Sequence, residues 1–410
     1  MAIGLRLENN ALNSKRKENI TNLIYFTGLL LIISVKFLMN TSLSATIGSL
    51  YRPVTIAAEI LFIIKYLAFQ KNSSLNFITF ICLEILAFIN YKYSKNGDLI
   101  YIIPVIFAAK NIDAKKILKF FMGLISGLLG IVIVLALLGK IPDFIFSYNA
   151  NGVNVTRHSL GMVYPTTLGA AIMYLTFAFL VYKKFELSLF QKMMIFVMAF
   201  VVREVAYAKT AMILLCMAGI IAIFYKPICR FLEKSNVIVP LLLVIIICFS
   251  IYIAYNFKTS SSVYQIINSK VFSNRLYLGY VAAMTYPIKI FGQFIYMRGY
   301  GGQTGYLMNQ GLLRTNYFYI DSFYLQLLLI YGVIVFCITL GAIFYFTFKF
   351  NKERKFALVV ILLLIVVDNI FEAYMFQYSF NFMLLLLFAN TKNLINKENM
   401  VGKNEKKRKY

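Results

Sequence analysis

The residues best suited to chemistry are concentrated between positions 258 and 321, which contain six basic side chains, nine tyrosines and a single acid, Asp321. The basic residues are Lys258, Lys270, Arg275, Lys289, Arg298 and Arg314. Arginine and lysine bind phosphate groups, arginine through a bidentate fork. Tyrosine adds an apolar ring and a hydroxyl, which suit contact with sugars. This composition favours an anionic, glycosylated ligand, and the alternative is a solvated segment paired with anionic lipid.

A second group of polar residues is Arg157-His-Ser-Leu-Gly161, which is followed by Tyr164-Pro165. His158 is the only histidine in the chain. A neutral imidazole beside Arg157 could accept a proton from a sugar hydroxyl. The alternative is that His158 is simply a polar residue at the membrane surface.

Other ionisable residues lie at the ends of predicted membrane spans. Arg203 and Lys209 flank one turn, and Asp368 and Glu372 are four residues apart on one face of a predicted helix. Charge in a membrane is costly, so such residues indicate either a functional site or a partner for an arginine. Five glycines between Gly292 and Gly305 predict tight turns or a close approach of two backbones.

The elements that position these residues are predicted to be membrane helices. Hydrophobic residues make up 60% of the 410-residue chain and charged residues only 14%, which one water-soluble core could not bury. Apolar runs of about 20 residues recur, each long enough to cross a bilayer. We predict an all-α polytopic protein with about twelve spans: 20–38, 47–69, 75–91, 98–109, 117–138, 161–182, 189–206, 208–225, 237–257, 322–347, 356–374 and 375–389.

The basic residues predict the orientation of these spans. They cluster at both chain ends and in every second short loop, which is typical of the cytoplasmic side. We therefore predict a cytoplasmic N-terminal segment (1–19), spans one to nine (20–257), a long basic extracytoplasmic loop (258–321), spans ten to twelve (322–389) and a basic cytoplasmic tail (390–410).

Composition also argues against several kinds of site. The net charge of +25 is explained by the loop pattern, so we predict no nucleic-acid partner. The five cysteines form no Cys-x-x-Cys spacing, and a single histidine cannot build a multi-histidine metal site. We predict neither a metal nor another cofactor.

Four stretches together resemble the Wzy family of bacterial oligosaccharide repeat-unit polymerases, which make O-antigen, capsule and exopolysaccharide. They are Lys110-Asn-Ile-Asp113 with Lys115-Lys116, Arg157 to Gly161 with Tyr164-Pro165, Ser273-Asn-Arg275 with Phe291-Gly292, and Asp321-Ser322-x-Tyr324-Leu325 with Tyr331-Gly332. Their order and spacing agree with the family over roughly residues 100 to 335. The combination carries the resemblance, because no single stretch is specific.

The chain departs from the family pattern at several of these positions. Tyr164 stands where the family often has histidine, and Thr166 stands where it has asparagine. A histidine-based role at that position is therefore not carried over. Lys209 replaces a common arginine, which keeps the charge and loses the bidentate fork.

The resemblance implies a membrane glycosyltransferase of the bacterial cytoplasmic membrane with an extracytoplasmic active face. It would transfer a growing glycan from undecaprenyl pyrophosphate to a lipid-linked repeat unit. Its substrate would be an undecaprenyl-pyrophosphate-linked oligosaccharide in the membrane lipid. Chain-length regulator and flippase proteins are possible partners.

This reaction requires cations at the leaving pyrophosphate, a base at the acceptor hydroxyl and a platform for sugars. For the cations we predict Arg157, Arg275 and Arg298, with Arg203, Lys209 and Arg314 as further substrate-binding residues. Asp321 and His158 are both candidates for the base. Tyr164 and Tyr324 are candidates for the platform.

Three other functions remain open from the sequence. An O-antigen ligase would use the same chemistry with a different acceptor. A lipid-linked oligosaccharide flippase would be a transporter, in which two related halves and a charged central cavity are expected. A scaffold of an export complex has no positive sign in the sequence. The long basic loop favours the polymerase.

Overall fold

The computed structural model describes residues 2–150, 153–270 and 272–396, and they are mostly helical. Among these residues, seven helices are long and apolar enough to cross a membrane, and a bent pair of helices would make an eighth span. The chain is therefore a multi-pass membrane protein, as its composition predicts. The count of twelve spans stays a prediction.

The elements follow one another along the chain with few long connections. The first half contains α1 (Ala2–Leu38), α2 (Ser44–Ala68), α3 (Ser74–Ser94), α4 (Asp98–Ala108), α5 (Ala114–Leu137), β1 (Ile145–Ala150), β2 (Val153–His158), α6 (Pro165–Tyr182) and α7 (Leu189–Val201) with the π-helical turn η1 (Val202–Ala206). The second half contains α8 (Lys209–Ile223), α9 (Tyr225–Lys234), α10 (Ile238–Tyr255), α11 (Ser262–Lys270), α12 (Arg275–Thr285), α13 (Gly302–Asn309), α14 (Phe323–Gln326), the π-helical turn η2 (Leu327–Tyr331), α15 (Gly332–Lys352), α16 (Phe356–Phe371), α17 (Met383–Leu386) and the 3₁₀ turn η3 (Lys392–Leu394).

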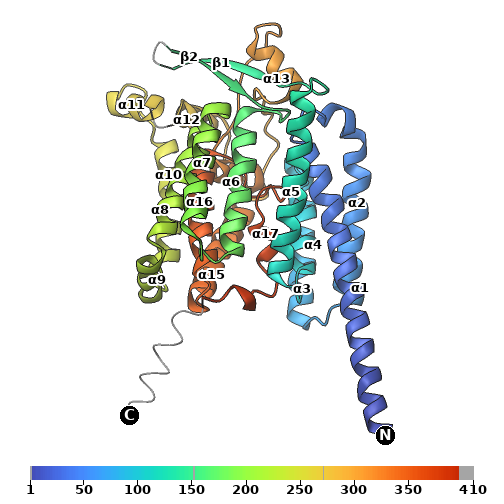
Figure 1. Cartoon of the computed structure of the whole chain (residues 1–410). Coiled ribbons are helices and arrows are strands. Elements are labelled where there is room, and N and C mark those ends of the chain that lie inside the picture. Colours follow the sequence, from blue (N-terminus) through green and yellow to red (C-terminus); the bar gives the residue numbers. More distant parts are fainter. Residues whose placement is uncertain (1, 151–152, 271, 397–410) are drawn as a thin grey trace.

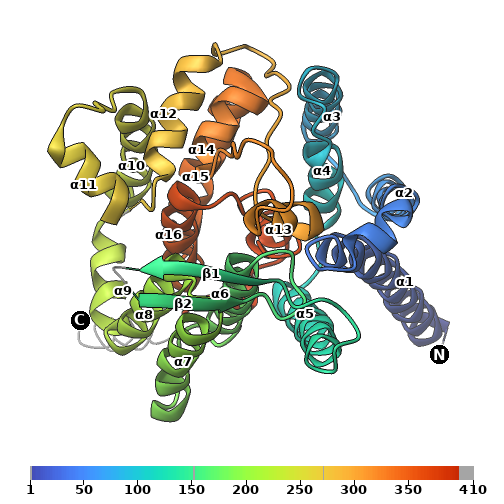
Figure 2. The same cartoon turned by 90° about the horizontal axis from the view of Figure 1, so that it is seen from above.

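The long helices run side by side between two ends of the molecule (Figure 1). We call the end that carries β1, β2 and α13 the hairpin end, and the end that carries α9 and η3 the terminal end. Seen from above, α1 to α5 form one side, α8, α10 and α12 form the other, and α16 lies between them (Figure 2). Helix α9 turns away from α8 by 86° at the terminal end.

Local sequence signals explain where several helices begin. The Asp113 carboxylate accepts hydrogen bonds from the backbone N–H groups of Lys115 and Lys116, at 2.7 and 3.2 Å, and so caps α5. Ser188 and Gln191 form a reciprocal capping box at the start of α7. Such caps satisfy the free N–H groups in the first turn of a helix.

The prediction of an all-helical chain needs one correction, because β1 and β2 form an antiparallel hairpin. Their register runs from Ile145 opposite His158 to Ala150 opposite Val153. The sequence between them is Asn151-Gly152, a dipeptide that favours a two-residue hairpin turn and lies outside the described residues. That signal was available in the sequence.

The predicted loop 258–321 also contains regular structure, namely α11, α12 and α13. Helix α12 packs against α10 and α14 through Gly279, whose α-carbon lies against Leu325 and Ala254. Leu276 and Ala282 of α12 are buried. The segment is therefore anchored to the helix bundle.

The predicted twelfth span, 375–389, is not a continuous helix. Its only helical part in the described structure is the four-residue α17. Non-helical backbone at membrane depth needs other hydrogen-bond partners. Asn369 Oδ1 accepts bonds from the N–H groups of Tyr374 and Met375, and the Asn381 amide donates to the Met375 carbonyl at 2.7 Å. Asparagine side chains thus replace part of the helical ladder.

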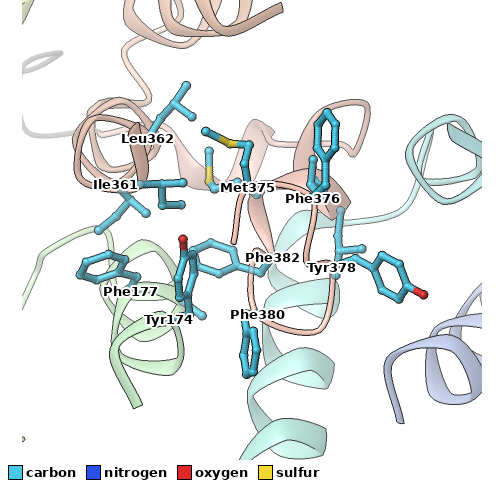
Figure 3. Close-up of a cluster of buried hydrophobic side chains, with 14 of the residues drawn as sticks. Tyr174, Phe177, Ile361, Leu362, Met375, Phe376, Tyr378, Phe380 and Phe382 are labelled. Atoms are coloured by element: carbon cyan, nitrogen blue, oxygen red, sulfur yellow. The ribbon is translucent and has the colours of Figure 1, made fainter. Parts of the chain in front are cut away.

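This irregular segment is enclosed by the core of the protein (Figure 3). Tyr378, Phe380 and Phe382 are almost completely buried, and Tyr174 and Phe177 of α6 lie beside them (Figure 3). Phe380 and Tyr374 make an edge-on ring contact at 5.4 Å. Burial within protein explains why this segment need not be helical.

The longest candidate span, Phe323–Lys352, is broken between η2 and α15 by Gly332, whose φ is +86°. Residues 287–299 lie along this break, and we call them the extended segment. Its Lys289 and Ile290 carbonyls accept bonds from the backbone N–H groups of Val333 and Ile334 at 3.1 and 3.3 Å. These are N–H groups that the start of a helix leaves without partners.

Asn90 of α3 ties the extended segment to the same break. Its buried amide donates to the Tyr331 carbonyl at 2.7 Å and to the Phe291 carbonyl at 3.0 Å. At Gly292 the two backbones are so close that an added Cβ would lie 2.0 Å from the Ile330 carbonyl oxygen. The close approach that the glycines predicted is confirmed at this position.

Candidate functional site

Arg275 is held by two carboxylates at the hairpin end, where α12 begins. Its Nη2 lies 2.9 Å from Glu372 Oε1, and its Nε lies 3.6 Å from Asp321 Oδ1. Its Nη1 donates to the Phe371 carbonyl at 2.6 Å, at the end of α16. All three charged side chains are largely buried. This geometry gives Arg275 a fixed position with most of its bonding capacity used.

The chain just before α12 accounts for the position of Arg275. The Asn268 carboxamide oxygen accepts a bond from the Tyr277 N–H at 3.0 Å, and its amide donates to Asn274 Oδ1 at 3.1 Å. Ser273 and Asn274 both have positive φ, at 48° and 67°. Asparagine tolerates this left-handed conformation better than most residues. The backbone therefore turns sharply immediately before Arg275.

Burial and neighbouring charges shift the pKa values of Asp321 and Arg275. Burial raises the pKa of Asp321 to about 7, Arg275 opposes that rise, and Glu372 adds to it. Burial lowers the pKa of Arg275, but Glu372 and Asp321 outweigh it, so the net direction is upward. A carboxyl that titrates near neutral pH is suited to act as a general base.

Tyr317 and Tyr319 line the approach to Asp321. Burial raises the pKa of Tyr317, and the nearby Asp321 and Tyr164 raise it further. Burial and the same carboxylate raise the pKa of Tyr319 to about 12. The Tyr317 ring stacks on that of Tyr300 at 4.5 Å. Tyr317 therefore lies near both Asp321 and Tyr164.

Arg157 reaches the same region from strand β2. Its Nε donates to the Ala206 carbonyl at 3.1 Å, and its Nη1 lies 3.4 Å from the Tyr164 hydroxyl. The guanidinium also lies over the Tyr164 ring, 5.3 Å from its centroid. No carboxylate among the described residues forms an ion pair with Arg157. Its charge is thus uncompensated, and guanidinium donors remain free for a ligand.

Tyr164 is positioned by both its neighbours and its place in the chain. It lies immediately before Pro165, the first residue of α6. Its ring meets that of Phe146 of β1 edge-on at 4.8 Å, and Phe146 in turn contacts Tyr306 of α13. The hairpin and α13 therefore cover this region together at the hairpin end (Figure 1).

The structure brings together four of the residues that the sequence nominated, together with two others. We call the group the arginine cluster: Arg157, Tyr164, Arg275, Tyr317, Asp321 and Glu372. They come from β2, the start of α6, the start of α12, the chain before α14 and the end of α16.

His158 lies apart from Arg157 because neighbouring strand residues point to opposite faces. Its Nδ1 lies 2.7 Å from Asp143 Oδ2. The other Asp143 oxygen accepts bonds from the backbone N–H groups of Ser159 and Leu160 at 2.9 and 2.7 Å. His158 therefore belongs to a structured turn, and Asp143 is a partner that sequence reasoning missed.

Arg298 is also directed away from the arginine cluster. Its backbone pairs with that of Phe318, and its guanidinium lies over the Tyr296 ring at 5.4 Å. The next residue, Gly299, has its α-carbon against the Tyr319 ring. Since side chains alternate along an extended chain, Arg298 points to the other face.

The remaining nominated residues have separate environments. Arg203 lies 3.7 Å from Glu204, and both side chains are more than half exposed. Lys209 lies over the ring of Tyr207 at 5.4 Å, and Arg314 is exposed. Tyr324 is fully buried, and its hydroxyl donates to the Val366 carbonyl at 2.9 Å. Tyr324 therefore presents no surface to a sugar in this structure, and we drop it from the platform.

Two residues of the arginine cluster were absent from the nominated set. Glu372 had been recognised as a possible partner of an arginine, and Arg275 is that arginine. Tyr317 had not been singled out. Tyr317, Tyr319 and Asp321 alternate in an extended stretch of chain, and this spacing was a usable signal for a shared face.

Asp368, one turn before Glu372, lies deeper and has a different partner. Its Oδ2 accepts a bond from the Tyr174 hydroxyl at 2.9 Å, and both side chains are buried. Among the described residues, no group of three histidine, cysteine or acidic side chains is arranged to hold a metal ion.

No protein-family model matches this chain, and neither the curated proteins nor the solved structures compared with it include a match. The arginine cluster and the sequence resemblance to polysaccharide polymerases are therefore the two indications of function. The geometry of the cluster is independent of that resemblance.

Proposed function

We propose that this chain is a polysaccharide polymerase of the bacterial cytoplasmic membrane. In this proposal about twelve segments cross the membrane, both termini are cytoplasmic, and the hairpin end faces outward. Basic segments support this orientation, since α9 and the C-terminal end of α15, which ends at Lys352, lie at the terminal end (Figure 1). The substrates are undecaprenyl-pyrophosphate-linked oligosaccharides, which the outward face receives from the surrounding lipid.

The proposed reaction joins a growing glycan to the next lipid-linked repeat unit. The acceptor hydroxyl oxygen attacks the anomeric carbon of the donor glycan, and a new glycosidic bond forms. The bond between that carbon and the pyrophosphate oxygen breaks, and undecaprenyl pyrophosphate leaves with the electron pair. The hydroxyl proton passes to a base.

Arg157 is the residue that we assign to the leaving pyrophosphate. It forms no ion pair with a carboxylate in the described part of the chain, and its two hydrogen-bond partners are neutral. A cation placed where negative charge develops stabilises the transition state. Arg275 is a weaker candidate for this role, because Glu372 and Asp321 already occupy it.

Asp321 is the residue that we assign as the base. Its pKa of about 7 leaves a useful fraction ionised at neutral pH and able to accept the acceptor proton. Arg275 holds this carboxylate in place. Tyr164, which contacts Arg157, and Tyr317, whose pKa is raised by the nearby Asp321, provide rings and hydroxyls for the sugars.

One observation carries this proposal: Arg157, which has no acidic partner in the described residues, lies against Tyr164, while Asp321, whose pKa is raised to about 7, and Tyr164 both lie near enough to Tyr317 to raise its pKa. Distant parts of the chain supply these groups. Glycosyl transfer from a pyrophosphate requires such a cation and such a base.

The test is the profile of lipid-linked glycans in a strain that produces Arg157→Gln in place of the native protein. We expect polymer to fall at least about tenfold, a loss of about 1.4 kcal/mol of transition-state stabilisation. Single repeat units should accumulate on lipid carriers that are accessible from outside. The matched control is Arg230→Gln, an exposed arginine on α9 at the terminal end, which should polymerise normally.

Other glycan profiles would indicate other functions. In a strain that lacks the protein, single units trapped on the cytoplasmic side would indicate a flippase. Long lipid-linked chains that are not transferred would indicate a ligase. Polymer of normal length and amount in the Arg157→Gln strain would contradict the proposed role of this residue.

A further inference from the structure

The extended segment presents an apolar stripe to the outside of the molecule. Phe294 and Tyr296 are 57% and 59% exposed, whereas Gln293 before them and Ile295 between them are 9% and 5% exposed. Side chains alternate in an extended chain, so the exposed set forms one continuous face. Ile288 and Ile290 extend this apolar surface, with exposed fractions of 49% and 60%.

The stripe lies at the level where two candidate spans approach the hairpin end. The backbone of the segment bonds to Ile330, Val333 and Ile334 of the span Phe323–Lys352. Asn90, four residues before the end of α3, bonds to Phe291. The Phe291 ring stacks on that of Tyr93, also of α3, at 6.1 Å. An apolar surface at this depth faces lipid chains rather than water.

A cation stands at one end of the stripe. Arg298 continues the alternation of Phe294 and Tyr296, and Tyr296 Oη accepts a bond from its Nη2 at 2.5 Å. No carboxylate among the described residues forms an ion pair with Arg298. An apolar surface that ends in an arginine complements an amphiphile with a long chain and an anionic phosphate head.

The same end of the stripe touches the chain that leads to the arginine cluster. The Arg298 N–H donates to the Phe318 carbonyl at 2.7 Å, and Phe318 N–H donates back at 3.1 Å. The neighbours of Phe318 are Tyr317 and Tyr319, and Gly299 lies against the Tyr319 ring. The backbone at Arg298 is therefore joined to the chain that leads to Asp321, although the Arg298 side chain itself projects from the opposite face.

We propose that this stripe is the docking surface for the polyprenyl chain of the lipid-linked substrate, with Arg298 binding its phosphates. This inference depends on the proposed function for the identity of the lipid. Annular phospholipid is the competing occupant. It accounts for the apolar residues, but it does not explain why the stripe ends at an arginine without an acidic partner in the described residues, on a segment paired with the chain that leads to Asp321.

The test is site-specific photocrosslinking of the purified full-length protein. Benzoylphenylalanine replaces Phe294, or Tyr296 in a second variant, in nanodiscs of phosphatidylethanolamine and phosphatidylglycerol doped with undecaprenyl pyrophosphate. The matched control replaces Ile78, a residue of α3 that is also 57% exposed. The mass of each adduct identifies the lipid that was captured.

At positions 294 and 296, we expect the fraction of adducts that contain polyprenyl lipid to exceed the mole fraction of undecaprenyl pyrophosphate in the bilayer by about tenfold. This enrichment corresponds to a tenfold preference in binding. Adducts at position 78 should reflect the bilayer composition. Arg298→Gln should reduce the polyprenyl adducts at position 294 several-fold and leave position 78 unchanged.

Adducts at positions 294 and 296 that mirror the bilayer composition would overturn the inference and identify the stripe as an ordinary lipid contact. That outcome leaves the polymerase proposal standing, because crosslinking requires no glycan transfer. Conversely, polyprenyl adducts at positions 294 and 296 could form even though a strain that lacks the protein makes polymer of normal length. This combination would support the docking surface and contradict the polymerase proposal.

Discussion

The two arginines of the arginine cluster have different kinds of partner. Arg275 contacts Glu372, Asp321 and a backbone carbonyl, so its charge is compensated within the protein. Arg157 contacts a carbonyl and a tyrosine, and its charge is not compensated by an acid in the described residues. Arg157 is partly buried, so an anionic ligand would offset the cost of its uncompensated charge.

The titration of Asp321 predicts how activity depends on pH. Only the ionised carboxylate can accept a proton, so the rate should rise with pH and level off above the pKa of about 7. Glu372 raises this pKa, and Glu372→Gln removes that effect while leaving Arg275 to act on Asp321 alone. The midpoint of the pH–rate profile should therefore move to lower pH in Glu372→Gln.

The measurement is the pH–rate profile of the purified protein in proteoliposomes supplied with lipid-linked repeat units. Glu186→Gln is the matched control, since Glu186 is exposed near the terminal end and pairs with Lys184. The control should retain the wild-type midpoint. A shift to higher pH in Glu372→Gln, or an equal shift in both variants, would contradict the assignment of Asp321 as the base.

At the scale of elements, broken helices build the site and its surroundings. The π-helical turn η1 ends at Ala206, whose carbonyl accepts from Arg157. The turn η2 and Gly332 interrupt the span Phe323–Lys352, and the extended segment bonds to the break. Such interruptions are stable in a membrane only when other groups satisfy the freed backbone. Asn90 and the extended segment provide these groups here.

The close contact at this break predicts a large effect of Gly292→Ala on stability. Gly292 has a φ of +83°, and its added Cβ would lie 2.0 Å from the carbonyl oxygen of Ile330 in η2, which is held by a hydrogen bond from the Gln293 N–H. We expect a destabilisation above about 4 kcal/mol, or failure to obtain monodisperse protein. Thermal unfolding in detergent, followed with size-exclusion chromatography, measures this effect.

Gly302→Ala is the matched control for that variant. Gly302 also has a positive φ, +73°, but its added Cβ would meet nothing within 4 Å. The backbone strain alone should cost about 1–2 kcal/mol. Equal losses in the two variants would show that strain, rather than the contact with Ile330, dominates at Gly292.

At the scale of the whole molecule, charge distinguishes the two ends. The terminal end carries short basic loops, whereas the hairpin end carries the arginine cluster and the tyrosine-rich segment. The orientation rule explains the first group of charges. The second group opposes that rule, and the proposed anionic substrate provides its explanation.

Cysteine labelling tests this orientation directly. The five native cysteines are replaced by alanine, and single cysteines are introduced as Leu312→Cys at the hairpin end and Lys71→Cys between α2 and α3. Leu312 is 75% exposed, and Lys71 is exposed as well. In spheroplasts, a membrane-impermeant maleimide should label position 312 only, and permeabilisation should then expose position 71. Labelling of position 71 alone in intact spheroplasts would reverse the orientation.

Residue type and spacing predicted many residues of the candidate site, but they did not predict which side chains lie together. Arg157, Tyr164, Arg275 and Asp321 were nominated because their chemistry and spacing favoured a phosphate and a sugar. Arg298 was nominated on the same grounds, yet its side chain points away from the cluster. Charge patterns give no information about the face of the chain from which a side chain projects.

The sequence by itself determined that the chain crosses a membrane several times, because runs of apolar residues exceed what a water-soluble core can bury. It could not determine that residues 375–389 form no continuous helix, since the hydropathy of an apolar run is the same whether or not the run is helical. Only the tertiary structure decided that Arg275 pairs with Glu372, 97 positions away, and that Arg157 has no acidic partner in the described residues. The reason is physical: hydropathy is a local property of the chain, whereas the partner of a buried charge depends on which distant segments pack against it.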